Sequence, residues 1–300
     1  MKYKRELAEN IKSGNFNTTE KFKTKKSLGQ NFLNNENVLK LIADSANIKE
    51  GELILEIGPG MGALTSKLLE KVSGAVGAKL LCIEKDHRLM ETLNEKFKEG
   101  VANEKINIIE EDILKWGSEE YFTKSKIKNF EYKIIANIPY YITGAIIEKF
   151  LEEKIKPSEM IFMVQKEVAQ RITNKDGKGS ILSLCTKYYA DVEILKIVSK
   201  GSFTPAPKID SAVIKITLKQ EKLLDEKYLN LENKYLSVVK VGLSHKRKTL
   251  ISNLKKSTDK DVSDVHWDNV FENLNIDKKI RGEDLDVDEF LKIVYNAYMV

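Results

Sequence analysis

Residues 53–62 have the sequence Leu53-Ile54-Leu55-Glu56-Ile57-Gly58-Pro59-Gly60-Met61-Gly62, which is the best indication of the fold class. Its first half is an apolar run of strand length, which predicts a buried β-strand. Its second half is a glycine-rich turn, and the apolar residues of 63–69 that follow have helical spacing. Glycines in such a turn let the backbone come close to a ligand without a clashing Cβ. A strand, a glycine turn and a helix in this order predict a nucleotide-binding α/β domain.

Three more apolar runs downstream have the length of strands, at residues 79–83, 106–109 and 132–136. Each ends in polar residues: Glu84 follows the first run, Glu110-Glu111-Asp112 the second, and Asn137 the third. Glu84 lies at about the distance from the glycine turn at which an acid holds ribose hydroxyls in nucleotide-binding folds. Ligands of open parallel α/β sheets bind at the carboxyl ends of the strands, so we expect these polar residues to share one site.

The segments between these strands, 61–72, 87–98 and 113–123, are long enough for crossover helices. Alternating strands and helices predict an α/β domain with a mainly parallel sheet. Further strands are expected at residues 160–164, 192–198 and 212–218. After Lys219 the pattern is charged and helical, without the alternation of strands. We therefore expect one domain at residues 25–219 and a small helical domain at residues 220–300.

The tetrapeptide Asn137-Ile138-Pro139-Tyr140 suits the methylation of an exocyclic adenine amine. The lone pair of such an amine is delocalised into the ring, and a site helps by accepting hydrogen bonds from the amine's protons. The side-chain oxygen of Asn137 and the carbonyl of the residue before the rigid Pro139 could both accept them. The Tyr140 ring can stack on the base and hold it flat. Taken alone, the tetrapeptide is equally well explained as a turn between a strand and a helix.

The loop Phe203-Thr204-Pro205-Ala206-Pro207-Lys208-Ile209-Asp210-Ser211 lies between the last two predicted strands. Its two prolines stiffen the backbone and are expected to leave Phe203 presented at the start of the loop. Ordinary packing of Phe203 in the core is an equal alternative.

Basic residues gather in two places. Residues 1–26 hold eight Lys or Arg against three Glu, a balance equal to the net charge of +5 of the whole chain. This pattern predicts a basic, flexible arm at residues 1–24 that contacts nucleic acid, with a solubilising tail as the alternative. Lys246, Arg247 and Lys248 precede the apolar Leu250 in an amphipathic element, and we expect them to contact RNA phosphates. A solvated surface is the alternative for these three residues.

The composition argues against several classes of protein. No apolar run approaches the roughly 20 residues needed to span a bilayer, and the charged N-terminus is unlike a signal peptide. The two cysteines, Cys82 and Cys185, and the three histidines have no spacing typical of metal ligands. We therefore expect a folded protein of the reducing cytoplasm, with no membrane association, disulfide or metal.

Four ordered motifs resemble those of the ribosomal RNA adenine N6-dimethyltransferase family. They are Leu28-Gly29-Gln30-Asn31-Phe32-Leu33, Glu56-Ile57-Gly58-Pro59-Gly60, the tetrapeptide and the Phe203 loop. Enzymes of this family use S-adenosylmethionine to dimethylate two adjacent adenines near the 3′ end of small-subunit rRNA. The resemblance covers nearly the whole chain from Lys25. The family often has Leu where this chain has Ile138, a difference that leaves the backbone carbonyl available.

The resemblance implies a Rossmann-like S-adenosylmethionine-dependent methyltransferase domain and an all-helical C-terminal RNA-binding domain. It implies a monomer whose partner is small-subunit rRNA within an assembling small ribosomal subunit. Carried over residue by residue, it implies a cofactor site at Asn31, Leu33, Gly58, Glu84, Asp112 and Asn137, to which the glycine turn adds Gly60. Glu84 would hold the ribose hydroxyls and Asp112 would accept from the amine of the cofactor's adenine. The catalytic residues implied are Asn137, Pro139, Tyr140 and Phe203, with Phe203 sandwiching the target base against Tyr140.

Three other functions share part of this pattern. A methyltransferase that acts on large-subunit rRNA and confers macrolide resistance has much of the same motif set, but the helical C-terminal part favours the small-subunit enzymes. A non-catalytic assembly factor could keep the fold, although intact Asn137 and Tyr140 argue against it. An NAD-dependent dehydrogenase would share the glycine turn and the acid but would leave the tetrapeptide unexplained.

Overall fold

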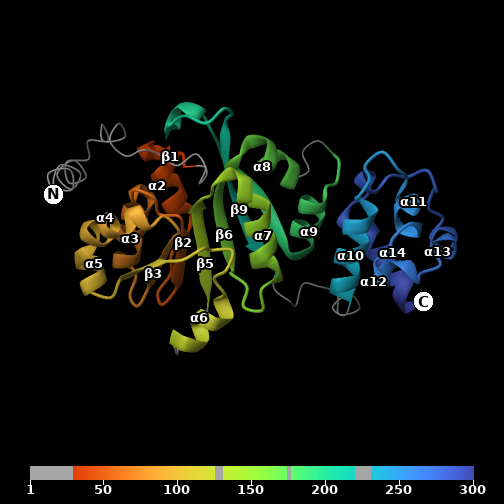
Figure 1. The fold of residues 1–300 in the computed structure, drawn as a ribbon, viewed down its shortest axis with the longest axis horizontal. Helices are drawn as coiled ribbons and strands as arrows, with labels where there is room; N and C mark the ends of the chain where they lie inside the picture. Colours follow the sequence, from red (N-terminus) through yellow and green to blue (C-terminus); the bar gives the residue numbers. More distant parts are fainter. Residues whose placement is uncertain (1–29, 126–130, 174–176, 220–230) are drawn as a thin grey trace. The chain divides into compact units, whose positions relative to one another are not determined.

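The computed structural model describes residues 30–125, 131–173, 177–219 and 231–300 (Figure 1). The arm predicted at residues 1–24 lies outside these residues. By their contacts, the described residues divide into two compact units. Those up to Ala169 and those of Glu193–Thr217 form one, here called the sheet unit; those of Gln170–Val192 and Leu218–Val300 form the other, here called the helical unit.

A seven-stranded sheet, within the described residues, organises the sheet unit in the order β4-β3-β2-β5-β6-β9-β7. The strands are β2 (Leu53–Ile57), β3 (Lys79–Glu84), β4 (Ile106–Glu110), β5 (Tyr132–Asn137), β6 (Glu159–Gln165), β7 (Ala190–Val198) and β9 (Ser211–Leu218). Strands β4, β3, β2, β5 and β6 pair in parallel, and β9 pairs with β6 antiparallel. All five residues of β2 are buried, as expected for a central strand covered on both faces. The predicted α/β class with a mainly parallel sheet is confirmed.

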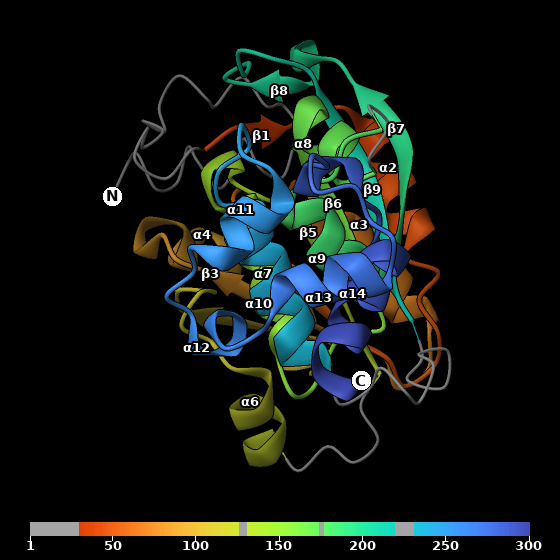
Figure 2. The same cartoon turned by 90° about the vertical axis from the view of Figure 1, so that its right-hand side faces the viewer.

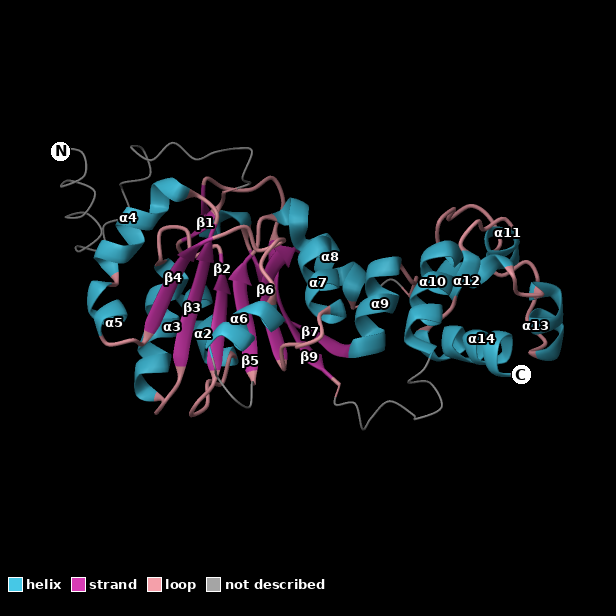
Figure 3. Ribbon diagram, turned by 60° about the horizontal axis from the view of Figure 1, so that its bottom comes forward, coloured by secondary structure: helices cyan, strands magenta, loops and turns pink. Residues whose placement is uncertain are grey.

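Crossover helices connect the parallel strands, as the alternating pattern predicts. The helices and 3₁₀ turns of this part of the chain are α2 (Glu36–Ser45), α3 (Ala63–Gly74), α4 (His87–Lys96), α5 (Lys98–Ala102), α6 (Ser118–Ser125), η3 (Tyr140–Ile142), α7 (Thr143–Glu152), α8 (Lys166–Ile172) and η4 (Lys200–Ser202). The side chain of Asn35 caps α2 by accepting from the backbone N–H of Val38. Apolar residues of α2, α3 and α4 pack with the sheet in one buried core. The carboxyl ends of the parallel strands lie toward the top of the view in Figure 3, and the turns that follow them meet there.

A short two-stranded ribbon lies beside the carboxyl ends of the strands. It pairs β1 (Phe32–Leu33) antiparallel with β8 (Phe203–Thr204), and Figure 2 shows the two side by side. Asn34 and Asn35 add hydrogen bonds to this ribbon, from Asn34 Nδ2 to Thr204 Oγ1 (2.8 Å) and from Asn35 Nδ2 to Ser202 Oγ (3.2 Å). The ribbon therefore fixes the start of the described chain against a segment far away in the sequence.

The helical unit contains α9 (Ile181–Tyr189), α10 (Glu232–Gly242), α11 (Leu250–Lys255), α12 (Lys260–Ser263), α13 (Trp267–Asn273), η7 (Gly282–Asp284) and α14 (Val287–Met299). Its inclusion of residues 170–192 differs from the predicted boundary, which placed them with the sheet. The reason is aromatic packing: the rings of Tyr188 on α9 and Tyr235 on α10 stack with centroids 4.5 Å apart. Tyr235 also donates its hydroxyl to the carbonyl of Leu184. In the described residues, no helix is both long and apolar enough to cross a membrane.

Candidate active site

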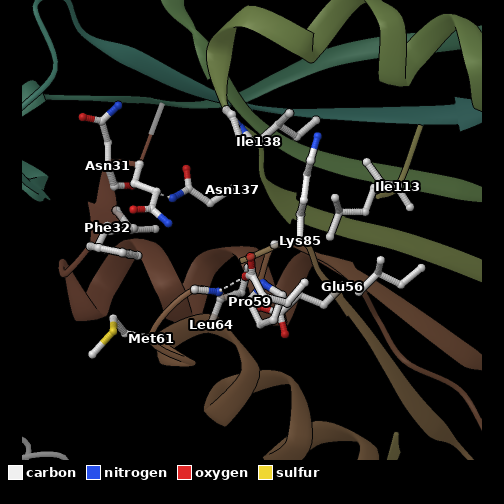
Figure 4. Close-up of a pocket in the computed structure, with 18 of the residues that line it drawn as sticks. Asn31, Phe32, Glu56, Pro59, Met61, Leu64, Lys85, Ile113, Asn137 and Ile138 are labelled. Atoms are coloured by element: carbon white, nitrogen blue, oxygen red, sulfur yellow. Dashed lines mark hydrogen bonds between the residues drawn. The ribbon is translucent and has the colours of Figure 1, made fainter. Parts of the chain in front are cut away.

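A cavity at the carboxyl ends of the parallel strands gathers nine of the ten predicted catalytic and cofactor-binding residues (Figure 4). The predicted residues that line it are Asn31, Leu33, Gly58, Gly60, Glu84, Asp112, Asn137, Pro139 and Tyr140. They come from the segment before α2 and from the ends of four strands, all within the sheet unit. Residues that are distant in sequence thus share one pocket, as the strand-end argument predicts.

The glycine turn forms one wall of the cavity, and its backbone conformation requires glycine. Gly58 and Gly60 have φ angles of 65° and 59°, in the left-handed region that other residues rarely adopt. A Cβ at Gly60 would lie 2.9 Å from Cε1 of Phe32, so any side chain would collide with that ring. A Cβ at Gly58 would meet nothing within 4 Å. The backbone at Gly58 is therefore bare on the side where a ligand could approach.

Glu84 holds the glycine turn in place from the end of β3. Its Oε2 accepts from the backbone N–H of Gly60 (3.0 Å), and its Oε1 accepts from the backbone N–H of Asp86 (2.8 Å). The residue is only 6% exposed, and burial raises the pKa of its carboxyl, although the two backbone hydrogen bonds oppose that shift. Each carboxylate oxygen can accept a second hydrogen bond, so Glu84 keeps capacity for a ligand.

Asp112 lines the same cavity and is paired with a cation, Lys85, which was not predicted from the sequence. Lys85 Nζ lies 2.8 Å from Asp112 Oδ2, and the backbone N–H of Leu114 donates to Oδ1 over 3.1 Å. The hydrogen bond from Lys85 holds the pKa of Asp112 below its usual value. Asp112 is therefore an ionised acceptor on this wall of the cavity.

The orientation of the Asn137 amide is fixed by a backbone contact. Its Nδ2 donates to the carbonyl oxygen of Asn31 over 3.0 Å, the contact drawn as a dashed line in Figure 4. Because a carbonyl only accepts, the amide nitrogen must face Asn31, and Oδ1 is turned away as an acceptor. Pro139 follows with φ −57° and ψ 126°, which ends the strand and starts η3.

Tyr140 and Tyr141 are the first two residues of η3, and their side chains differ in exposure. The Tyr140 hydroxyl lies 2.6 Å from Ser211 Oγ, and burial raises the pKa of this half-buried phenol. Tyr141 also lines the cavity and is 62% exposed. The first ring is thus held by a hydrogen bond, while the second is presented to solvent.

Glu56 is a buried acid in the cavity wall; it opens one of the four motifs, but no role of its own was predicted for it from the sequence. It is 1% exposed, and burial raises the pKa of its carboxyl to about 7, although the hydrogen bond from Cys82 opposes this shift. Lys96 is the nearby cation, and its ammonium donates to the carbonyls of Met61 and Gly62 at 3.1 Å each. Near neutral pH, Glu56 therefore populates both protonation states.

The expectation that Phe203 is presented at the start of its loop is wrong. Phe203 is 3% exposed, belongs to the buried core and is absent from the residues that line the cavity. Its backbone pairs with that of Leu33 in the β1–β8 ribbon, and both side chains enter the core. Burial of an aromatic ring removes a large apolar area from water. This gain favours a buried Phe203 over one that is exposed at the start of the loop. Core packing, the alternative for this residue, is what the structure has.

The remaining predicted residues lie outside the cavity. Lys246, Arg247 and Lys248 are exposed on the turn between α10 and α11, in the helical unit. Among the residues that the structure describes, no group of His, Cys, Asp and Glu is arranged to hold a metal ion.

Several lining residues carried no prediction of their own: Gln30, Phe32, Met61, Lys85, Ile113, Leu114 and Tyr141. Most of them adjoin a predicted residue in the sequence. Their positions in or beside the motifs could therefore have indicated that they line the cavity. Gln30 contributes in another way, because its Nε2 donates to the buried Asp86 over 2.9 Å and ties the N-terminal segment to the turn after β3.

Comparisons with known proteins agree with this geometry. The sequence model of the family described as ribosomal RNA adenine dimethylase matches residues 21–294. A relative from Fusobacterium nucleatum subsp. nucleatum, named ribosomal RNA small subunit methyltransferase A, is 38% identical over 280 residues, covering 91% of this chain and 97% of the relative. The crystal structure of a dimethyladenosine transferase from Plasmodium falciparum has a TM-score of 0.69 at 26% identity, covering 87% of this chain and 95% of that one. The 23S rRNA methyltransferase ErmE has a TM-score of 0.66 at 22% identity, covering 89% of this chain and 99% of that one, and shows the fold alone.

Proposed function

The chain belongs to the ribosomal RNA adenine dimethylase family, and we propose that it dimethylates the N6 amines of two adjacent adenines near the 3′ end of small-subunit (16S) rRNA. Support for the small subunit comes from the name of the Fusobacterium relative, which is similar along almost its whole length. The large-subunit alternative has only the weaker likeness to ErmE. Membership of a methyltransferase family removes the dehydrogenase alternative.

The residues of the cavity fit S-adenosylmethionine, which supplies an electrophilic methyl group when bound. The bare backbone at Gly58 leaves room for the close approach of a ligand. Glu84 has acceptor capacity for ribose hydroxyls, and the ionised Asp112 can accept from the exocyclic amine of an adenine. Asn31, Leu33, Gly60 and Asn137 complete this proposed cofactor site. Direct transfer of a methyl group from a sulfonium sulfur to an amine nitrogen needs no metal, and none is assigned.

The observation that carries the proposal is the fixed amide of Asn137. Because its nitrogen is engaged by the Asn31 carbonyl, its oxygen is available to accept from the amine of a target adenine. The backbone carbonyl of Ile138, ahead of Pro139, is the second proposed acceptor. Two such hydrogen bonds draw the lone pair of the amine out of the ring, so the nitrogen becomes a nucleophile. Tyr140, held by Ser211, is the proposed platform for the base.

Positioning is the main catalytic contribution in this account. With S-adenosylmethionine bound, the target amine would form its bond to the methyl carbon as the methyl–sulfur bond breaks, and S-adenosylhomocysteine would leave. The residues of the cavity would supply proximity and orientation, which can lower a barrier by roughly 7 to 11 kcal/mol. The amine becomes acidic only after it has gained the extra methyl group, so no dedicated base is required. The target adenine has to leave its RNA stack to reach the cavity, as base-modifying enzymes generally require.

The setting proposed for this reaction is an assembling small ribosomal subunit in the cytoplasm, with the protein acting as a monomer. Lys246, Arg247 and Lys248 are proposed to contact RNA phosphates, which suits their exposure on a turn of the helical unit.

The test is the distribution of label between ribosomal subunits. Purified, unmethylated small and large subunits are incubated separately with the protein and with S-adenosylmethionine that carries a labelled methyl group. We expect label in the rRNA of the small subunit, near its 3′ end. Label confined to the large subunit would replace this substrate by the macrolide-resistance alternative, and binding without any label would favour a non-catalytic assembly factor.

A further inference from the structure

A second hollow of the sheet unit is rich in lysine. It lies where β6 ends and β9 begins, and its lining residues are Lys166, Glu167, Lys200, Lys208, Ile209 and Asp210. Lys200 and Lys208 are exposed, and Lys166 is half-buried. In the part of the chain that the structure describes, none of these three ammonium groups forms an ion pair with a carboxylate, although many other lysines do.

The two acids of the hollow do not neutralise it. Three lysines against Glu167 and Asp210 leave an excess of one positive charge. Asp210 is already engaged by the backbone, because its Oδ1 accepts from the N–H of Lys200 (3.0 Å) and its carbonyl accepts from the N–H of Lys166 (3.0 Å). These contacts hold the backbones of Lys166 and Lys200 beside Asp210. Both contacts use backbone N–H groups, so the ammonium groups of the two lysines take no part in them.

The hollow adjoins the active-site cavity through Ser211. Ser211 follows Asp210 directly and pairs with Gln165, the last residue of β6. Its hydroxyl lies 2.6 Å from the hydroxyl of Tyr140, which lines the cavity. The strands β5 and β6 are neighbours and end at the same edge of the sheet, with Asn137 opposite Met163. Charges in the hollow therefore lie next to the place proposed for the target base.

We propose that Lys166, Lys200 and Lys208 bind phosphates of the RNA strand that adjoins the target adenine. This inference rests on the proposed function, because it assigns the hollow to the same substrate. An adenine turned into the cavity pulls its flanking backbone toward the protein, and the anionic phosphates on that side need cations. Lysine ammonium groups without carboxylate partners supply these charges, and each one that meets a phosphate releases condensed counterions. The sheet unit then positions the RNA itself, in addition to any contact made by the helical unit.

The test is a triple variant with a matched control. Lys166→Gln, Lys200→Gln and Lys208→Gln are combined in one protein. The control combines Lys49→Gln, Lys79→Gln and Lys105→Gln, which remove the same charge from the amino ends of β2, β3 and β4, at the opposite edge of the same sheet. Binding to an unmethylated RNA with the sequence of the 3′ end of small-subunit rRNA is measured over a range of salt concentrations. Calorimetry with S-adenosylmethionine shows whether each variant keeps its cofactor site.

We expect the salt dependence of RNA binding to become shallower in the triple variant, by about 0.7 log units of slope for each lost contact to single-stranded RNA. The control should keep the slope of the unmodified protein, and cofactor affinity should be the same in all three proteins.

A triple variant with the slope of the control would overturn the inference. So would normal binding of the isolated RNA together with lost binding of the whole subunit, because the hollow would then contact a ribosomal protein. Failure of the unmodified protein to methylate small subunits would count against the proposed function, while the slopes would still decide whether the hollow binds phosphate.

Discussion

At the scale of single residues, Glu56 combines complete burial with a place in the cavity wall. Its carboxyl is desolvated, and its Oε2 lies 3.4 Å from Cys82 Sγ, a weak donor that compensates only partly. Burial therefore raises its pKa from 4.5 to about 7. The buried carboxylate form of Glu56 therefore lowers the free energy of unfolding, and this effect grows as the pH rises.

We predict that Glu56 makes the protein less stable as the pH rises. Because its folded-state pKa lies above the unfolded value, its contribution is fully present below pH 4.5 and is lost as the pH rises through 7. Relative to Glu56→Gln, the free energy of unfolding of the unmodified protein should fall by up to about 3 kcal/mol between pH 5 and pH 8. Denaturant titrations at several pH values give this difference. If the free energies of unfolding of the two proteins change in parallel with pH, Glu56 has the same pKa in the folded and unfolded states, and the prediction is wrong.

Residue positions were predictable wherever they follow from the local pattern. Glu84, Asp112 and Asn137 each stand at or just after the end of an apolar run, and parallel strands bring such ends together. Phe203 was not predictable in this way, because its burial depends on pairing with Leu33, a residue from the other end of the domain. The partner of Asp112 was also missed, since an exposed lysine such as Lys85 gives no sign of which acid it meets.

At the scale of elements, β2, the glycine turn and α3 form one unit, and hydrogen bonds to Glu84 stabilise it. Two backbone amides depend on this carboxylate, so it shapes the turn as well as offering acceptors to a ligand. The turn also packs closely against Phe97, the residue after α4: a Cβ at Gly62 would lie 2.7 Å from Cε2 of Phe97, so a larger residue would not fit there. Phe97 also marks the point where the predicted helix at residues 87–98 divides into α4 and α5.

We predict that Glu84→Ala weakens the binding of S-adenosylmethionine at least about tenfold, because a hydrogen bond to a charged acceptor contributes roughly 1.5 to 3 kcal/mol. Glu110→Ala is the matched control, since Glu110 pairs with Glu84 on the adjacent strand and lies outside the cavity. Calorimetry should detect the loss only in the first variant. Unchanged affinity in Glu84→Ala would make this acid a structural support of the turn and nothing more.

At the scale of the whole molecule, the α/β class with a mainly parallel sheet followed from the sequence. The order of the strands within the sheet and the full division into units come from the structure alone. The end of the sheet unit near residue 217 is close to the predicted boundary at Lys219. Residues 170–192 join the helical unit because Tyr188 meets Tyr235, and the apolar pattern of α9 does not specify which partner it packs against. Periodicity predicts that a helix has a buried face, and tertiary packing alone decides what covers it.

The cavity around Asn137 is proposed to dimethylate two adjacent adenines of small-subunit rRNA. A single-turnover reaction on unmethylated small subunits at saturating S-adenosylmethionine, with the methyl groups counted and located by mass spectrometry, is the decisive experiment. The unmodified protein should place two methyl groups on each of two adjacent adenines near the 3′ end. Asn137→Ala should react about 10² to 10³ times more slowly, by analogy with the loss of one transition-state hydrogen bond, and Tyr140→Phe, which keeps the ring, should stay close to the unmodified protein. Full activity of Asn137→Ala under these conditions would contradict the account, because the tetrapeptide would then be only a turn.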